Sequence, residues 1–348
     1  MNSKYLHTPI TSLFCAMHRL KFILVSFCIL TNLKLLAQQQ FDHMQREVLE
    51  SSANQWLCKE LRLSNPGYFD CSRTLWTLPK AGEFLLFGEP IVLEQQHIDR
   101  FQQLWFPNGD CNQYLSVVAM ADLYGPLFKR KAEQLHLHPD IALLPLVLSG
   151  CNQQFRYEDF AGLWAMTTEI ARRQKLRVDT LVDERLGGDF TTDAALKYIA
   201  YLSSEYSGDY MRVSVAYRWG MMEVADTDFA LRGLRFLDAL RPELADYLRF
   251  QAYTFELFRF ARSENQLNNC FDILGHFQPV IIDKPILIKA IAHVLNVDEE
   301  RIRSSNPVYT GSFLMPGYRK VPFVLEDTIM ARFKNSVESI ANWKPSKD

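Results

Sequence analysis

Hydrophobic residues recur at the spacing of an amphipathic helix over most of the central part of the chain. Between about Glu94 and Phe260 they return every three or four positions, which places them on one face of successive helices. Turn-forming residues separate these runs, for example at Pro107-Asn108-Gly109 and at Gly187-Gly188. The pattern predicts an all-helical domain over residues 94–262, with helices at residues 98–105, 115–135, 141–148, 162–173, 192–205, 211–217 and 231–260.

The segments on either side of this domain follow different patterns. Residues 38–93 form an N-terminal extension, with helical spacing over residues 41–63 and then a stretch broken by Pro and Gly that predicts loops with one hairpin. After Cys270 the order is strand, two short helices and strand. This order predicts a compact α/β module over residues 278–326, and residues 327–348 are expected to be a C-terminal tail.

The first forty residues have the composition of an export signal. Basic residues precede an apolar run over residues 22–30, and Ala37 stands just before three glutamines. A basic start, a short apolar core and a small residue are typical of a secretory signal peptide, whereas a membrane-spanning helix needs about 20 apolar residues. We expect residues 1–37 to direct export to the periplasm. An uncleaved membrane anchor and a start at Met17 are the alternatives.

Cysteine usage permits disulfides but leaves their pairing open. Of the 7 cysteines, Cys15 and Cys28 fall in the expected signal peptide. Cys58 and Cys71 are the first candidates for a disulfide because they are close in sequence, and the alternative is that every remaining cysteine is a buried thiol. No Cys or His spacing matches a zinc site, so we expect neither a metal nor another cofactor. The remaining cysteines are Cys58, Cys71, Cys111, Cys151 and Cys270.

Length and charge narrow the class of protein. With 348 residues, of which 48% are hydrophobic, the chain can bury a large core and is expected to form two or three domains. The formal net charge of -2 argues against nucleic acid as a partner, because a nucleic-acid-binding surface needs an excess of basic residues.

Several motifs follow one another in the central domain. They include Leu144-Pro145-Leu146-Val147-Leu148-Ser149-Gly150, Ala161-Gly162-Leu163-Trp164-Ala165-Met166, Val182-Asp183-Glu184-Arg185, Thr192-Asp193-Ala194-Ala195-Leu196 and Ala216-Tyr217-Arg218. In this order they resemble the signature motifs of lytic transglycosylases of the membrane-bound D type, which cut the glycan strands of peptidoglycan. The resemblance covers about residues 89–325. It implies a mainly α fold, with a goose-lysozyme-like helical domain followed by the small α/β module.

The C-terminal module has a resemblance of its own. The segments Val297-Asp298-Glu299-Glu300-Arg301-Ile302, Asn306-Pro307 and Met315-Pro316-Gly317 resemble a divergent LysM repeat, a small domain that holds N-acetylglucosamine-containing glycans. The resemblance therefore implies a second contact with glycan.

The position of the family's catalytic acid is occupied by Leu148. Family enzymes protonate the glycosidic oxygen with one glutamic acid, and the C6 hydroxyl of the sugar then attacks to leave a 1,6-anhydro end. Leucine cannot donate or accept a proton, and general acid–base catalysis alone is worth about a hundred- to ten-thousandfold in rate. Ala165 and Arg218 also stand where the family has glutamine and asparagine. The resemblance thus implies a degenerate enzyme with a retained scaffold.

The resemblance also implies which residues line the former cleft. Trp164 could stack on a sugar ring or belong to the core, and a cationic Arg218 in a cleft would suit an anionic ligand such as a muramyl lactate or a peptide carboxylate. The alternative for Arg218 is that it points to solvent. The residues expected to line the glycan-binding cleft are Ser149, Trp164, Ala165, Met166, Tyr217 and Arg218.

Three acids could in principle replace the missing one. Glu158 is the foremost candidate and Asp159 its neighbour, both in the loop between the two cleft motifs, although a solvated loop carboxylate lacks the apolar pocket that raises the pKa of a general acid. Glu243 matches a structural glutamate of the family. The charged residues Asp183, Glu184 and Arg185 are expected to form a structural ion-pair loop.

These observations favour a periplasmic, catalytically degenerate transglycosylase homologue that binds peptidoglycan glycan strands or a partner in the cell envelope. Two alternatives remain. One is an active enzyme with a displaced acid, and the other is a protein scaffold of an envelope complex that does not bind glycan. An open groove beside Leu148 would favour glycan binding, and a filled one would favour the scaffold.

Overall fold

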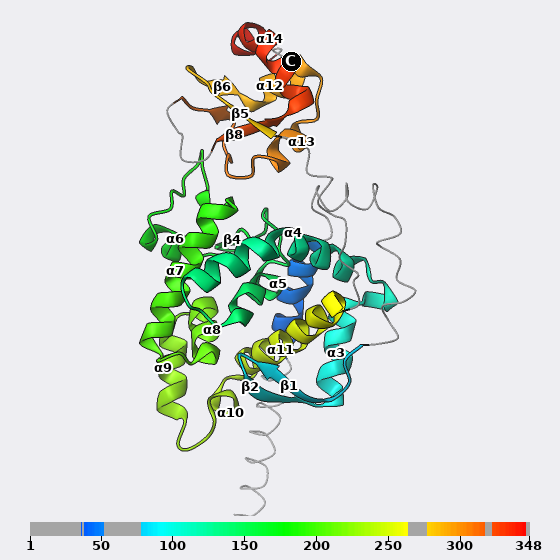
Figure 1. Cartoon of the computed structure of the whole chain (residues 1–348), viewed down its shortest axis with the longest axis vertical. Helices are drawn as coiled ribbons and strands as arrows, with labels where there is room; N and C mark the ends of the chain where they lie inside the picture. The colour runs from blue at the N-terminus through cyan, green and yellow to red at the C-terminus, as the bar shows by residue number, and fades with distance from the viewer. Residues whose placement is uncertain (1–35, 37, 52–77, 264–276, 317–321, 346–348) are drawn as a thin grey trace, which may run out of the picture.

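The computed structural model describes residues 36, 38–51, 78–263, 277–316 and 322–345, which form a larger helical domain and a smaller C-terminal module (Figure 1). The protein is mainly helical over these residues, as the sequence pattern predicts. Apart from Leu36, the expected signal peptide lies outside the described residues, as do Cys58 and Cys71. No helix in the part of the chain that the structure describes combines the length and the apolar character needed to cross a membrane.

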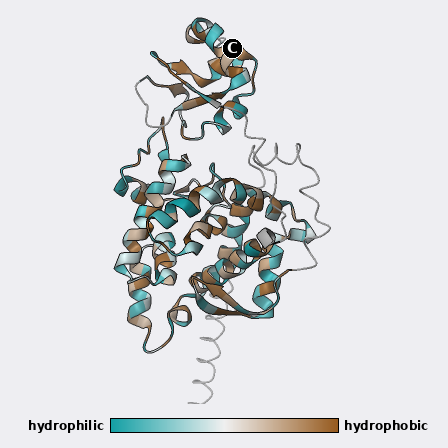
Figure 2. Ribbon diagram, viewed as in Figure 1, coloured by the Kyte–Doolittle hydropathy of each residue, from teal (hydrophilic) through white to brown (hydrophobic). Residues whose placement is uncertain are grey.

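The larger domain is built from consecutive helices around α11. After a helical stretch at residues 38–51, the helices are α3 (Gln95–Trp105), α4 (Asn112–Gln134), α5 (Leu144–Leu148), α6 (Thr168–Arg173), α7 (Asp189–Glu205), α8 (Tyr210–Trp219), α9 (Met221–Ala230), α10 (Phe236–Ala239) and α11 (Pro242–Ser263), with 3-10 turns η3 (Pro107–Gly109), η4 (Pro139–Leu143) and η5 (Glu184–Leu186). α11 packs against α3, α5 and α8, and most of its hydrophobic side chains are buried. Figure 2 shows the hydropathy of each residue along these helices. This core holds α5, and with it Leu148, in place.

The hairpin expected in the N-terminal extension is formed by β1 (Gly82–Leu86) and β2 (Glu89–Leu93). The two strands pair antiparallel around a turn at Phe87 and Gly88, both of which have positive φ. Alternate residues such as Phe84 and Ile91 are buried against α11, because successive side chains of a strand point to opposite faces.

The prediction of one helix over residues 162–173 is wrong for its first half. β3 (Arg156–Tyr157) pairs with β4 (Phe160–Ala161), the chain then turns back so that Ala161 bridges Met166, and α6 begins only at Thr168. Gly162 has φ +78° at this turn, and a Cβ atom there would lie 1.8 Å from the backbone oxygen of Arg185. Only glycine fits, so the hydrophobic spacing of the segment serves a tight turn rather than a helix.

The helix predicted over residues 231–260 is also interrupted. α9 ends at Ala230, and Arg232 and Gly233 follow with positive φ, a conformation that stops a right-handed helix. α10 and α11 then start separately, and α11 begins with Pro242, which suits the first helical turn because its missing N–H would have no partner there.

The C-terminal module has two short sheets and three helices. β5 (Phe277–Val280) pairs antiparallel with β8 (Phe323–Glu326), β6 (Ile286–Leu287) pairs with β7 (Phe313–Leu314), and the helices are α12 (Ile288–Leu295), α13 (Glu299–Ser304) and α14 (Asp327–Asn342). The expected C-terminal tail is thus largely a helix. α14 packs on α12 and buries Ile329, Met330, Phe333 and Ile340, so it completes the core of the module.

The module is docked on the loop before η5 of the helical domain. Val182 and Tyr309 form an antiparallel bridge, the amide of Asp183 donates to the Val308 carbonyl at 2.9 Å, and the amides of residues 310 and 311 both donate to the Leu181 carbonyl. Val182 belongs to the hydrophobic core of the module. Backbone pairing and shared apolar packing therefore join the two parts at this point (Figure 1).

Candidate functional site: a closed cleft beside an open hollow

Leu148 is the last residue of α5 and lies in the main hydrophobic core. Its exposed fraction is 1%, and α5 packs directly against α11. An aliphatic side chain in these surroundings offers no acid or base, and it leaves no room beside it for a sugar ring. The residue at the position that the motif resemblance assigns to the catalytic acid is therefore enclosed by the core.

Ser149 ties the end of α5 to the turn over residues 161–166. It is completely buried, and its hydroxyl donates a hydrogen bond to the Leu163 carbonyl at 2.5 Å. A hydroxyl has a single proton to donate, so this bond uses its donor capacity. In this structure Ser149 holds the backbone together and presents no donor to a ligand.

Trp164, Ala165 and Met166 lie inside the protein. The Trp164 indole nitrogen donates to the Thr192 hydroxyl at 3.0 Å, and its ring packs edge-on against Phe128 with ring centroids 5.2 Å apart. Exposed fractions of 0%, 2% and 0% leave Trp164, Ala165 and Met166 without a free face. Trp164 therefore has the contacts of a core residue and not of a sugar-stacking platform.

Tyr217 joins α8 to the same turn. Its hydroxyl donates to the Trp164 carbonyl at 2.8 Å, and only 3% of the residue is exposed. Burial raises the pKa of Tyr217 far above its usual range, so the hydroxyl stays protonated and serves as a hydrogen-bond donor. Tyr217 and Ser149 thus both donate hydrogen bonds to backbone carbonyls of the turn over residues 161–166.

Arg218 differs from these residues because it carries a charge into the interior. It is 6% exposed, its guanidinium carbon lies 3.6 Å from the centre of the Phe160 ring, and Nη2 contacts the Met44 sulfur at 2.7 Å. Nη1 is buried without a hydrogen-bond partner among the residues that the structure describes. Burial lowers the pKa of Arg218 to about 10, and nearby Tyr247 and Glu158 only partly oppose this effect.

A hollow of about 510 Å³ opens next to Arg218, between α6, α7, α8 and α9. Aromatic and thioether groups dominate its walls, with Thr167 and the Glu169–Arg173 ion pair at its edge. Of the residues in this wall, sequence reasoning assigned only Tyr217 and Arg218 to the cleft. Its principal side chains are Phe160, Tyr198, Tyr217, Arg218, Trp219 and Met222.

The helical stretch at residues 38–51 covers this region from the N-terminal side. Phe41, Val48 and Leu49 are buried in the main core, and Asn152 donates to the carbonyl and hydroxyl of Ser51 at 3.1 and 2.7 Å. Met44 of the same stretch contacts Arg218. The extension is therefore an integral part of the domain and helps to close the former cleft.

The acids that might replace the missing one lie outside apolar pockets. Glu158 is exposed on the turn between β3 and β4, with φ 51°. Although partial burial alone would raise the pKa of Asp159, hydrogen bonds from Thr168 and the nearby Arg185 lower it, so Asp159 is held ionised. Glu243 pairs with Arg241 at 3.1 Å. The lowered pKa of Asp159, the exposure of Glu158 and the ion pair of Glu243 all differ from the apolar surroundings of a general acid.

The loop with Asp183 and Arg185 has structural contacts. The two side chains form two hydrogen bonds of 2.9 Å to each other, and both are almost fully buried. Arg185 also donates to the backbone oxygens of Asp159 and Met166, and Arg156 pairs with Asp183 at 3.0 Å. This network braces the turn over residues 161–166 against the loop that carries the C-terminal module.

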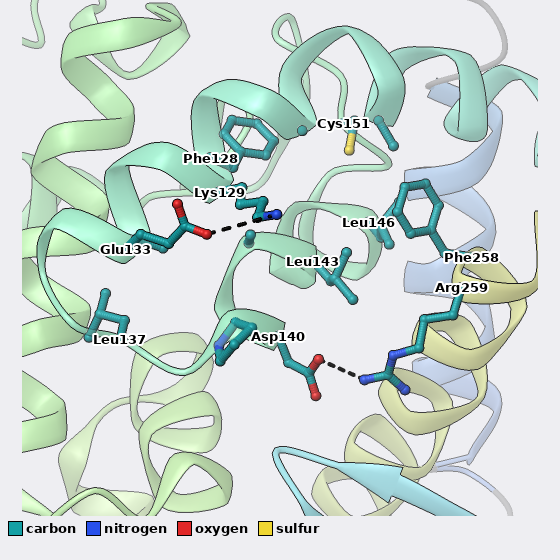
Figure 3. A pocket seen from close by; sticks show the side chains of 15 residues that line it. Phe128, Lys129, Glu133, Leu137, Asp140, Leu143, Leu146, Cys151, Phe258 and Arg259 are labelled. Carbon is teal, nitrogen blue, oxygen red and sulfur yellow. Dashed lines mark hydrogen bonds and ion pairs between the residues drawn. The ribbon is translucent and has the colours of Figure 1, made fainter. Parts of the chain in front are cut away.

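A second, smaller cavity of about 220 Å³ lies between α4, η4 and α11 (Figure 3). Its lining is mainly apolar, and the Arg259–Asp140 ion pair of 2.6 Å closes one side.

Cys151 is an unpaired, fully buried thiol in the lining of this cavity, and burial raises the pKa of the thiol strongly. Cys111, in contrast, is disulfide-bonded, so the expectation that all mature cysteines are free thiols is wrong.

Groups that could hold a metal are also absent from the described part of the chain, where no three His, Cys, Asp or Glu side chains converge.

No family model matches the sequence. One curated relative, named "Putative tributyltin chloride resistance protein", from Alteromonas sp. (strain M-1), is 29% identical over 103 residues. The match covers 29% of this chain and 50% of the relative. The chain therefore spans about half the length of the curated relative that it matches.

Proposed function

We propose that this protein is a periplasmic homologue of the lytic transglycosylases that binds glycan strands of peptidoglycan without cutting them. The observation that carries the proposal is an open hollow with aromatic walls that includes Tyr217 and Arg218 of the expected cleft, while the leucine at the expected acid position is buried in the core. Aromatic faces suit the apolar faces of sugar rings, and the hollow is within the 300–1,000 Å³ typical of ligand sites. In this proposal the helical domain has the goose-lysozyme-like fold.

The lack of cleavage follows from the chemistry of the glycosidic bond. Protonation of the leaving oxygen needs an acid within hydrogen-bond reach, and Leu148 supplies none. Ser149 and Tyr217, the other hydroxyl groups of the expected cleft, already donate to backbone carbonyls. A strand bound in the hollow would therefore remain intact.

The C-terminal module contributes a second glycan contact in this proposal, as its LysM-like motifs imply. Its buried Asn306, part of the Asn306-Pro307 motif, donates to the Ile302 and Val324 carbonyls and accepts from the Val324 amide. These three bonds join α13 to β8. Docking on the helical domain would hold the module at a constant position relative to the hollow, and two linked sites on one strand bind more tightly than either alone.

The test is to incubate the purified protein with peptidoglycan sacculi and to measure co-sedimentation and released muropeptides. We expect the protein to sediment with the sacculi and no 1,6-anhydro products to form. Anhydro products would overturn the proposal, and their loss in Glu158→Gln would identify an enzyme with a displaced acid. A Glu243→Gln variant tests the other candidate glutamate, and anhydro products that persist in it would assign the role to Glu158.

A scaffold without glycan binding is the second candidate. It is favoured by the burial of Leu148 at the expected acid position. It is also favoured by three exposed hydrophobic side chains, one in the wall of the hollow and two farther along α9 and the turn that follows it. Met222, Phe229 and Leu234 have exposed fractions of 72%, 91% and 56%, as protein-binding surfaces often do. Failure of the protein to sediment with sacculi would support this candidate against glycan binding.

A further inference from the structure

Arg218 is a buried cation that lacks an anion. Arginine has five N–H donors, yet only Nη2 has a recorded partner, the weakly accepting sulfur of Met44. No carboxylate of the described residues forms an ion pair with Arg218, although most of the other partly or fully buried arginines of the helical domain have one. Glu158 has a Coulombic effect on Arg218 but forms no ion pair with it.

An unpaired buried charge is costly, and such groups in native proteins call for a specific explanation. The Phe160 ring at 3.6 Å and the Trp219 ring at 5.7 Å stabilise the guanidinium through their π faces, but they leave its hydrogen-bond donors unused. The lowered pKa of Arg218 has the same cause, because the neighbouring groups do not fully compensate for its desolvation. A bound anion would supply the missing acceptors.

The hollow beside Arg218 provides the place for such an anion. Arg218 is part of its wall, together with Phe160 and Trp219, the two rings that hold the guanidinium. The other cation of the wall, Arg173, is exposed and already paired with Glu169 at 2.6 Å. Arg218 is therefore the cation in this wall that is ready to accept a negative group.

We propose that Arg218 is a specificity residue that binds a carboxylate carried by the glycan ligand of this hollow. The inference rests on the proposed function. The carboxylate is either the free lactyl group of a muramic acid residue or a carboxylate of its attached peptide, since both present the same planar anion. A planar guanidinium pairs well with a planar carboxylate. Because Arg173 is paired with Glu169, Arg218 supplies the one net positive charge of this wall, and Glu158 adds negative charge nearby. One positive charge is better matched to a ligand with one negative charge than to a phosphate dianion.

A ligand can reach the guanidinium of Arg218 only if the side chain of Met44, which lies against it, moves slightly. Nη1 has almost no exposed surface, and Met44 of the helical stretch at residues 38–51 occupies Nη2. Shortening Met44 to alanine should free a donor and strengthen the binding of a carboxylate ligand severalfold. Loss of the preference for carboxylate in Met44→Ala would contradict this geometry.

The experiment is calorimetric titration of the full chain with three soluble glycans. Chitotetraose has no carboxylate, a tetrasaccharide of alternating N-acetylglucosamine and N-acetylmuramic acid has free lactyl carboxylates, and the same tetrasaccharide with stem peptides has only peptide carboxylates. We expect one of the two carboxylate ligands to bind about ten- to a hundredfold more tightly than chitotetraose, as a charge-assisted pair predicts. The better ligand of the two identifies the source of the carboxylate.

Variants then assign the preference to a residue. Arg218→Gln should remove the preference, so that the carboxylate ligands bind no more tightly than chitotetraose, whereas Arg173→Gln, the matched control in the same wall, should keep it. Equal binding of all three glycans by the native protein would overturn the role of Arg218 and leave glycan binding intact. Binding of none would instead refute the proposed function, so the two failures are distinguishable. The comparison of ligands on the native protein does not depend on how well a variant folds.

Discussion

Replacing Arg218 by methionine should stabilise the unliganded protein. The substitution removes the charge and all three guanidinium nitrogens but keeps a flexible apolar chain between Phe160 and Met44. The lowering of the Arg218 pKa to about 10 corresponds to roughly 3 kcal/mol of destabilisation by the charged form at neutral pH. The cation–π contact with Phe160 offsets about 1–2 kcal/mol of this destabilisation, because the desolvated guanidinium lies over the ring. The net expectation is a free energy of unfolding about 1–2 kcal/mol higher for Arg218→Met.

The pH dependence has a definite sign. Because the pKa of Arg218 is lower in the folded state than in the unfolded state, the penalty is fully present below about pH 10 and disappears as the pH rises toward 12.5. Between about pH 6 and pH 9 the difference between the variant and the native protein should therefore stay constant. Any change in that difference over this range would come from a group other than Arg218.

The assay is urea unfolding at pH 7, followed by circular dichroism, with comparison of midpoints and slopes. Arg100→Met is the matched control, because Arg100 also stacks on an aromatic ring but lies 3.3 Å from Asp42 and 2.8 Å from Asp246. Its removal takes away the ion-pair partner of Asp42 and leaves Asp246 with Arg249, so it should destabilise the protein by about 3 kcal/mol or more. A loss of stability in Arg218→Met, with an unchanged slope, would refute the view that this cation is unpaired.

Three further predictions test the closed cleft and the docked module. Leu148→Glu should lower the free energy of unfolding by several kcal/mol at pH 7 and by less near about pH 4, where a buried carboxyl is protonated. The variant should also yield no anhydro products. Urea titrations at both pH values and muropeptide analysis check these two outcomes. Cys151 should resist alkylation by iodoacetamide at about pH 8 in the folded protein and react in urea, because burial raises its pKa, and peptide mapping that finds it modified in the native state would contradict its burial. Gly311→Ala should loosen the C-terminal module, because a Cβ atom there would lie 2.7 Å from the Leu181 side chain and 3.0 Å from its Cα; an unchanged radius of gyration and unchanged protease resistance between the two parts would refute this.

Local rules predict much of the helical domain. Helices α4, α7 and α8 lie close to the positions that hydrophobic spacing indicates, because one face of each packs on the core. The same rules fail at residues 162–166, where a long-range contact decides the conformation. Gly162 must pass within van der Waals distance of the Arg185 backbone, which no spacing pattern of neighbouring residues can express.

The expected tail after residue 326 is a related case. α14 has a hydrophobic face typical of a packed helix, yet its partner, α12, is known only once the module is assembled. The helical stretch at residues 38–51 was expected as a helix in the extension, but its contact with Arg218 through Met44 joins residues 174 positions apart. Contacts at such separations depend on the path of the whole chain.

The sequence by itself determined that the expected acid position carries no proton, because this follows from the identity of Leu148 alone. It also determined that the chain is mainly helical, since hydrophobic periodicity reports which faces are buried. Only the tertiary structure decided that Ser149, Trp164 and Tyr217 are enclosed and that Arg218 is a buried cation at the wall of a hollow. Burial and electrostatic balance are properties of all the groups around a side chain, and those groups come from distant segments that only folding brings together.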